Sequence, residues 1–159
     1  MNHLKPVETM VSERNRALHE IWKSRAEDRV APRRGDITLS LVRTLTPWMW
    51  MVDVLEQGKD FRFRLSGDNV NQFLGGNYTG QSLSLLPHSR FVERVRRALA
   101  HCVEHKEPVA LGPVASGYAG KEHWEVEIVA LPLSEDGQAI NCLMGAIELW
   151  PLGTHEAIS

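Results

Sequence analysis

Two segments of this chain have the length of a β-strand and carry apolar residues on both faces, which constrains the fold more than any other feature. An antiparallel strand with one face in water alternates between apolar and polar residues. These segments do not alternate, apart from an interruption at Asp53, so their sheet must be covered on both faces. The alternating sets are Trp48, Trp50, Val52 and Val54 against Met49, Met51 and Leu55, and Cys142, Met144 and Ala146 against Leu143, Ile147 and Leu149.

The remaining periodicities predict an α+β fold with a five-stranded, mostly antiparallel sheet, helices on one face and an N-terminal amphipathic helix. The clearest period of two is Phe61, Phe63 and Leu65 against Arg62 and Arg64. Gly112-Pro113 predicts a kink or bulge in its strand, and Asp136-Gly137 predicts a tight hairpin turn. Strands are expected at 48–55, 61–66, 109–116, 122–133 and 138–150, and helices at 10–30, 68–74, 82–86 and 88–106.

Length and composition predict one globular domain. The chain has 159 residues, 43% hydrophobic and 24% charged, with a net charge of −2, which does not favour nucleic-acid binding. We expect an N-terminal helix and leader at 1–46, the domain at 47–150 and a flexible tail at 151–159. No apolar run is long enough to span a membrane, and the start lacks a secretory signal. Cys102 and Cys142 lie in apolar surroundings and predict buried free thiols in a reducing cytoplasm.

The second sheet face needs a cover, and the helix at 10–30 is the candidate. It either packs within the chain or forms a partner or homodimer interface, and the sequence leaves both open. In the second case the interface residues are Leu18, Ile21, Trp22, Met49 and Met51.

Catalytic and metal signatures are weak. The sequence has no Gly-Lys-Ser/Thr loop, no dinucleotide fingerprint and no nucleophile elbow. Glu125 and Glu127 share one strand face and are predicted to be solvated rather than an acid–base couple. His101 and His105 are spaced to hold a metal on one helix, but no third ligand is evident. We therefore assign no catalytic and no metal residues.

Three stretches resemble a PAS domain. Residues 61–67 and 73–80 are similar to its strand, short helix and glycine turn, and residues 131–137 to its closing hairpin. Trp22 and residues 32–36 resemble the leader of a short PAS subfamily common in alphaproteobacteria. The resemblance covers about 15–150. It implies a five-stranded antiparallel sheet with helices on one side enclosing a pocket, in a sensory or protein-interaction module.

The resemblance also bears on whether the chain binds flavin, haem or another small molecule. Asn77-Tyr78-Thr79 holds no cysteine where flavin-binding relatives place a reactive one. Haem-binding relatives use a histidine on the long helix, but helical periodicity turns His101 and His105 away from the apolar stripe near Val95. No cofactor is assigned, and an unknown small molecule or a filled core both remain open. The expected pocket walls are Phe63, Leu65, Phe73, Tyr78, Phe91, Val95, Leu99, Trp124, Val126 and Met144.

Together these features predict a non-catalytic, cytoplasmic sensory or regulatory module that signals by contact with another protein, as a homodimer and without nucleic acid or membrane. The alternatives are a haem- or other cofactor-binding sensor and a small-molecule enzyme.

Overall fold

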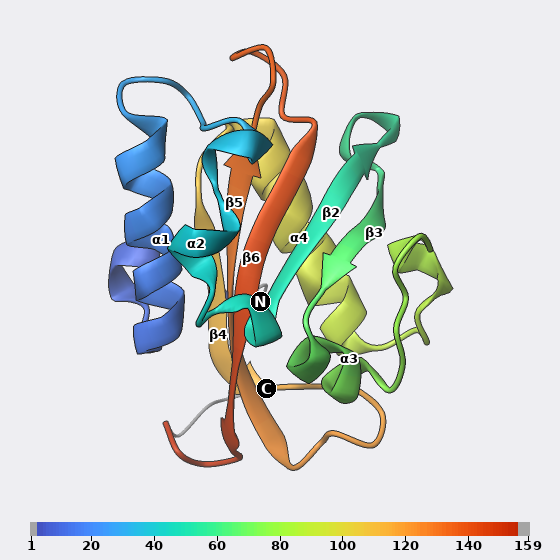
Figure 1. Ribbon diagram of the computed structural model, residues 1–159. Helices are drawn as coiled ribbons and strands as arrows, with labels where there is room; N and C mark the ends of the chain where they lie inside the picture. The colour runs from blue at the N-terminus through green and yellow to red at the C-terminus, as the bar shows by residue number, and fades with distance from the viewer. Residues whose placement is uncertain (1–2, 156–159) are drawn as a thin grey trace.

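The computed structural model describes residues 3–155. Its centre is a six-stranded antiparallel sheet in the order β1-β4-β5-β6-β2-β3 (Figure 1). The prediction of an α+β fold with an antiparallel sheet is confirmed, with a short extra strand, β1, that the sequence pattern did not reveal because it has only two residues. The strands are β1 (Leu4–Lys5), β2 (Met49–Leu55), β3 (Asp60–Ser66), β4 (Val109–Ala115), β5 (Trp124–Leu133) and β6 (Cys142–Pro151).

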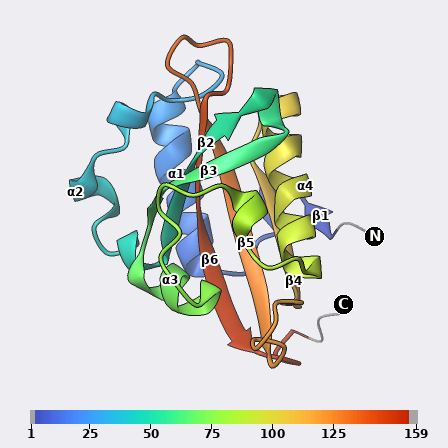
Figure 2. The same cartoon turned by 90° about the vertical axis from the view of Figure 1, so that its right-hand side faces the viewer.

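Helices cover both faces of this sheet. α3 and α4 lie on one face, which we call the cavity face, and α1 lies along β5 and β6 on the other, which we call the α1 face (Figures 1 and 2). The α-helices are α1 (Glu13–Ala26), α2 (Leu39–Val42), α3 (Asp68–Leu74) and α4 (Arg90–His105). Short 3₁₀ turns occur at Val7–Thr9, Arg34–Asp36, Thr46–Trp48, Glu56–Gly58 and Leu83–Leu85.

α1 is shorter than the predicted 10–30 because local chemistry sets both of its ends. The Ser12 hydroxyl accepts a hydrogen bond from the Asn15 amide at 3.0 Å and caps the first turn. Glu27 takes a positive φ of 56° and ends the helix, well before Pro32. α4 is capped in the same way by Ser89, whose hydroxyl accepts from the Val92 amide at 3.2 Å.

Two of the strands are irregular. The register of β4 shifts between Leu111 and Val114, which confirms the irregularity predicted at Gly112-Pro113. In β3, Met51 pairs with Leu65 and Val52 with Phe63, so Arg64 is the extra residue of a bulge. Because a bulge changes which face the following residue occupies, the period of two seen in the sequence does not extend to Leu65.

The β5–β6 connection is longer than a two-residue hairpin turn. β6 begins at Cys142 rather than near 138. The Asp136 carboxylate accepts hydrogen bonds from the Gln138 and Ala139 amides at 2.8 and 2.9 Å. These bonds fold the backbone into a compact loop in place of further strand pairing.

The buried residues form a core on each side of the sheet. Cys102 and Cys142 are free and buried, as predicted, and burial raises the pKa of the Cys142 thiol to about 11. Of the predicted tail, 156–159 lie outside the described residues, as do 1–2 of the leader. Within residues 3–155 no helix has the length and apolar character needed to cross a membrane.

Candidate functional site

An apolar cavity lies between the cavity face of the sheet and the helices α3 and α4. Its volume is about 50 Å³, and its lining is almost wholly apolar. Gly145 helps to shape it, because a side chain there would collide with the Trp50 indole, which lies across β6. The lining residues are Trp50, Val52, Phe63, Val70, Phe73, Leu74, Leu83, Leu86, Phe91, Val95, Leu99, Ile128 and Ile147.

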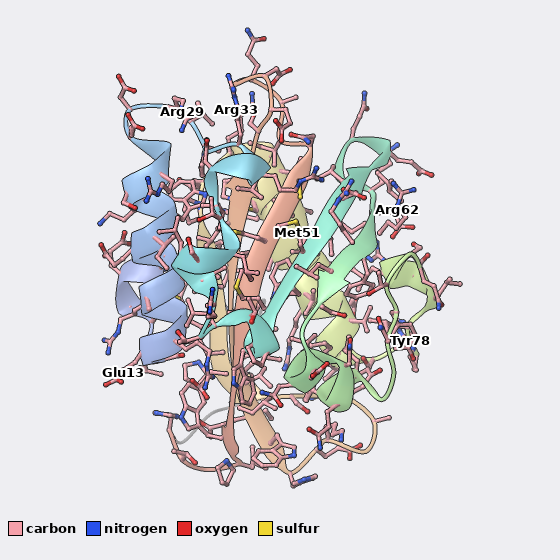
Figure 3. All side chains as sticks on the ribbon, in the orientation of Figure 1. Glu13, Arg29, Arg33, Met51, Arg62 and Tyr78 are labelled. Atoms are coloured by element: carbon pink, nitrogen blue, oxygen red, sulfur yellow. The ribbon has the colours of Figure 1, made fainter. Side chains whose placement is uncertain are left out.

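The structure brings half of the expected pocket walls to this cavity. Those that line it are Phe63, Phe73, Phe91, Val95 and Leu99. Val126 is buried on the cavity face but is not part of the lining. Trp124 lies at a separate cleft near the end of the sheet. Tyr78 packs beside the Phe63 ring at 6.3 Å (Figure 3), outside the lining.

Leu65 and Met144 lie away from the cavity because of strand geometry. The bulge at Arg64 turns Leu65 to the α1 face, where it is 50% exposed. Met144 pairs with Met51 and lies on the α1 face too, fully buried. Figure 3 shows Met51 on this side of the sheet, opposite α4. The interpretation of Leu65 and Met144 as cavity walls is therefore wrong.

Several cavity residues were missed, although the sequence held a signal for some of them. Trp50, Val52 and Ile147 belong to the alternating sets of the two doubly apolar strands. Nothing in the sequence told which alternate set faces the helices. Register pairs Trp50 with Gly145 and Val52 with Leu143, and so places this set on the cavity face.

An aromatic cluster closes one end of the cavity. Phe73 and Phe91 have ring centres 5.1 Å apart, and Tyr118 lies 5.4 Å from each. The Tyr118 hydroxyl donates to the Leu74 carbonyl at 2.7 Å. Burial raises the pKa of Tyr118 to about 12, so the phenol stays neutral. Tyr118 was not predicted, because it comes from a turn and has no periodic partners.

The cavity does not fit haem. Its lining holds no histidine, cysteine or tyrosine to ligate iron. His101 instead borders an open cleft beside α1, with its ring 3.4 Å from the Glu107 carboxylate, and His105 is exposed. Within residues 3–155 no group of three or more His, Cys, Asp or Glu side chains is placed to hold a metal ion.

On the α1 face, Glu127 joins the N-terminal flank, which we define as residues 3–26, to the sheet. Glu127 is fully buried. Its carboxylate accepts hydrogen bonds from the Val11 and Ser12 amides at 2.8 and 3.0 Å, from the Lys5 ammonium at 2.9 Å and from the Asn15 carboxamide at 3.1 Å. The negative charge lies at the start of α1, where the helix dipole favours it.

Glu125 plays the same part for the C-terminal segment. It too is fully buried. Its carboxylate accepts from the Gly153 amide at 3.0 Å and from the His155 amide at 3.1 Å, and lies 2.6 Å from the His155 ring nitrogen. The prediction that Glu125 and Glu127 are solvated is therefore wrong. Sequence alternation located them on one face, but it could not show that residues 3–26 and 153–155 would cover that face.

The residues expected at a partner interface are mostly covered within one chain. Leu18, Trp22, Met49 and Met51 are buried, and Ile21 is partly buried. The Trp22 indole donates to the Pro132 carbonyl at 2.7 Å and holds α1 on β5. One chain therefore supplies α1 as the cover of its own second sheet face, and an interface at these residues stays a prediction.

The chain is thus an α+β domain in which helices enclose an apolar cavity on one face of an antiparallel sheet. A family model described as PAS domain matches residues 10–148. The chain belongs to the PAS domain family, and its general role is that of a sensory or regulatory module. No curated protein matches it. The alphaproteobacterial subfamily stays a prediction.

Proposed function

We propose that this protein is a non-catalytic sensory module that passes a signal by contact with a signalling protein, and that it works as a homodimer. The event sensed is occupancy of the apolar cavity. The response is a change in how the N-terminal flank packs on the opposite face of the sheet. Two buried, unpaired cysteines suit work in the reducing cytoplasm.

One observation carries this proposal: neighbouring residues of the same strand serve both faces. Ile128 of β5 lines the cavity, and Glu127 beside it holds the start of α1. Ile147 and Glu148 repeat the arrangement on β6, where Glu148 pairs with Arg14 of α1 at 2.8 Å. Because adjacent strand residues point to opposite faces, a displacement at the cavity is felt at the anchor of α1.

The mechanism is a shift between two populations. A ligand that binds better when α1 is packed in one way favours that packing, by as much as its affinities for the two states differ. The cavity is too small and too apolar for a polar cofactor, so its ligand is a small apolar molecule of a few heavy atoms.

Xenon tests this coupling, because it enters apolar cavities and makes no polar contacts. We expect pressurised xenon to shift the NMR methyl signals of Leu99, Ile128 and Ile147. The amide signals of Val11 and Ser12, on the other face, should shift with them. The matched control is Leu99→Phe, which fills the cavity and should abolish both sets of shifts.

Two results would contradict the proposal. If the cavity methyl signals do not respond to xenon, the cavity is a closed part of the core. If they respond while the Val11 and Ser12 signals do not, the cavity accepts a guest but is not coupled to the N-terminal flank. The protein would then be an adaptor whose protein contacts do not depend on a ligand.

A further inference from the structure

A further hollow, separate from the apolar cavity and from the cleft beside α1, opens at one end of the sheet. Its volume is about 260 Å³, near the lower end of the range for small-molecule sites. It lies among α3, the turn between β4 and β5, and the end of β6, which gather at the lower end of Figure 1. We call it the tryptophan cleft, and its lining residues are Trp48, Asn69, Gln72, Phe73, Lys121, Trp124 and Leu149.

Local structure brings these side chains together. Asn69 and Gln72 are three residues apart on α3 and so share one face of the helix. Phe73 and Leu149 supply the apolar part of the lining. The backbone at Lys121 is fixed, since its carbonyl accepts from the Ser116 hydroxyl at 2.7 Å and from the Trp124 amide at 3.1 Å.

The polar groups of this cleft have no partners among residues 3–155. Neither the Asn69 nor the Gln72 carboxamide, nor the Lys121 ammonium, makes a hydrogen bond or ion pair there. Other side chains of the same types are engaged: Asn71 bonds to Ser66, and the Trp22 indole donates to Pro132. The tryptophan cleft is therefore lined by hydrogen-bond donors and acceptors that make no hydrogen bond of their own within the described chain.

Charge and ring geometry narrow the class of ligand. Lys121 is the only charged residue of the lining, which contains no acid. The Arg14 guanidinium stacks on Trp48, 4.1 Å from the ring centre, but its charge is paired with Glu148 at 2.8 Å, so Lys121 supplies the positive charge of the cleft. Two indoles offer flat apolar surfaces, and two carboxamides can each donate and accept hydrogen bonds.

We propose that the tryptophan cleft binds a small planar acid, a single aromatic or heteroaromatic ring that bears one carboxylate. The ring packs against the indoles, Lys121 pairs with the carboxylate, and Asn69 and Gln72 bond to its remaining polar edge. This site goes beyond the proposed function, because it takes an anionic ligand at a different place. Phe73 lines both the cleft and the apolar cavity, so the two sites share a wall.

The test uses three probes on the full chain: benzoate, its uncharged analogue benzamide, and the non-planar acid cyclohexanecarboxylate. Binding is followed by NMR at the indole N–H signals of the tryptophans. We expect benzoate to shift the signals of Trp48 and Trp124 and to leave that of Trp22 unchanged. Benzamide and cyclohexanecarboxylate should each bind at least about tenfold more weakly, since each lacks one of the two recognised features.

Variants then assign the residues. Lys121→Gln should weaken benzoate binding by roughly ten- to a hundredfold and leave benzamide binding unchanged, because it removes one charge-assisted hydrogen bond. Gln72→Ala should weaken both probes. Lys59→Gln is the matched control: Lys59 is exposed and lies outside the cleft, so its loss should not matter.

Three results would overturn the proposal. Benzoate leaves Trp48 and Trp124 unshifted at millimolar concentration; cyclohexanecarboxylate binds as well as benzoate; or Lys121→Gln binds benzoate no differently from Lys59→Gln. The probe comparison uses the unaltered protein, so it does not depend on any variant folding. Failure here also leaves the xenon test intact, because that test reports on a different cavity.

Discussion

At the scale of single residues, the buried glutamates of β5 are the unusual feature of this molecule. A carboxylate that is removed from water is stable only when its oxygens are hydrogen-bonded. Glu127 meets this requirement through the N-terminal flank, and Glu125 through the segment at Gly153 and His155. The Glu127 carboxylate therefore holds the N-terminal flank on the sheet, and the Glu125 carboxylate holds residues 153–155.

We predict that Glu127→Ala lowers the free energy of unfolding by about 3–5 kcal/mol, because it leaves the Lys5 ammonium and buried amides of the flank without their acceptor. Urea denaturation measures the loss, and hydrogen exchange should show α1 losing protection before the sheet. The control is Glu104→Ala, whose side chain is 78% exposed and which should change stability by less than about 0.5 kcal/mol. Equal effects of the two variants would refute the anchoring role of Glu127.

His19 predicts a pH dependence. Burial, and then the charge of Lys23, hold the pKa of His19 below its ordinary value of 6.5, although Glu20 and Glu8 oppose them. Of the charged groups around it, Lys5, His101 and Glu107 border the same cleft. The His19 imidazole binds a proton more readily in the unfolded chain than in the folded one. The stability that neutral His19 contributes is therefore complete above about pH 6.5 and is lost as the pH falls through the lower pKa of the folded state.

The unfolding free energy should therefore fall between about pH 7.5 and pH 5, and His19→Asn should show a shallower fall. Urea denaturation at the two pH values measures the difference. His88→Asn, at an exposed position, should keep the slope of the unaltered protein. A slope unchanged by His19→Asn would mean that other groups carry the dependence.

At the scale of elements, the bulge in β3 separates two residues that the sequence treats alike. Phe63 is buried in the cavity lining, whereas Leu65 is half-exposed on the other face. We predict that Phe63→Ala costs about 3–5 kcal/mol of stability and that Leu65→Ala costs less than about 1 kcal/mol. Thermal or urea unfolding of the pair decides the matter, and comparable losses would place Leu65 back in the core.

Element types followed well from the sequence, and their details did not. The period of two located β3 and β5, strand-length stretches apolar on both faces located β2 and β6, and helical spacing located α1 and α4, because each pattern extends over several residues. The bulge at Arg64 and the loop at Asp136 escaped prediction. The bulge depends on how the single residue Arg64 is paired, and the loop depends on the hydrogen bonds of Asp136. A periodic pattern over many residues does not report such a local feature.

At the scale of the whole molecule, one chain covers both faces of its own sheet. Of the residues proposed for a dimer interface, Ile21 is the one that is not buried in the single chain. It is therefore the proper place to test the homodimer without damaging the core.

We predict that Ile21→Glu lowers the solution mass from that of a dimer to that of a monomer, as measured by light scattering after size-exclusion chromatography, with little loss of secondary structure. An isologous interface presents Ile21 twice, so one substitution introduces two charges. The control Leu85→Glu changes a leucine that is 63% exposed and should leave the mass unaltered. A dimer that survives Ile21→Glu would require an interface elsewhere.

The sequence by itself determined the α+β class, the need to cover the sheet on both faces, the family resemblance and five of the thirteen residues that line the cavity. These depend on local periodicity, which every residue of a strand or helix reports. Only the tertiary structure decided which alternate set faces the cavity, that Met144 belongs to the other core, and that Glu125 and Glu127 are buried. The physical reason is that register and burial are set by segments distant in the chain: whether a strand glutamate meets water depends on where α1 and the residues after β6 come to lie.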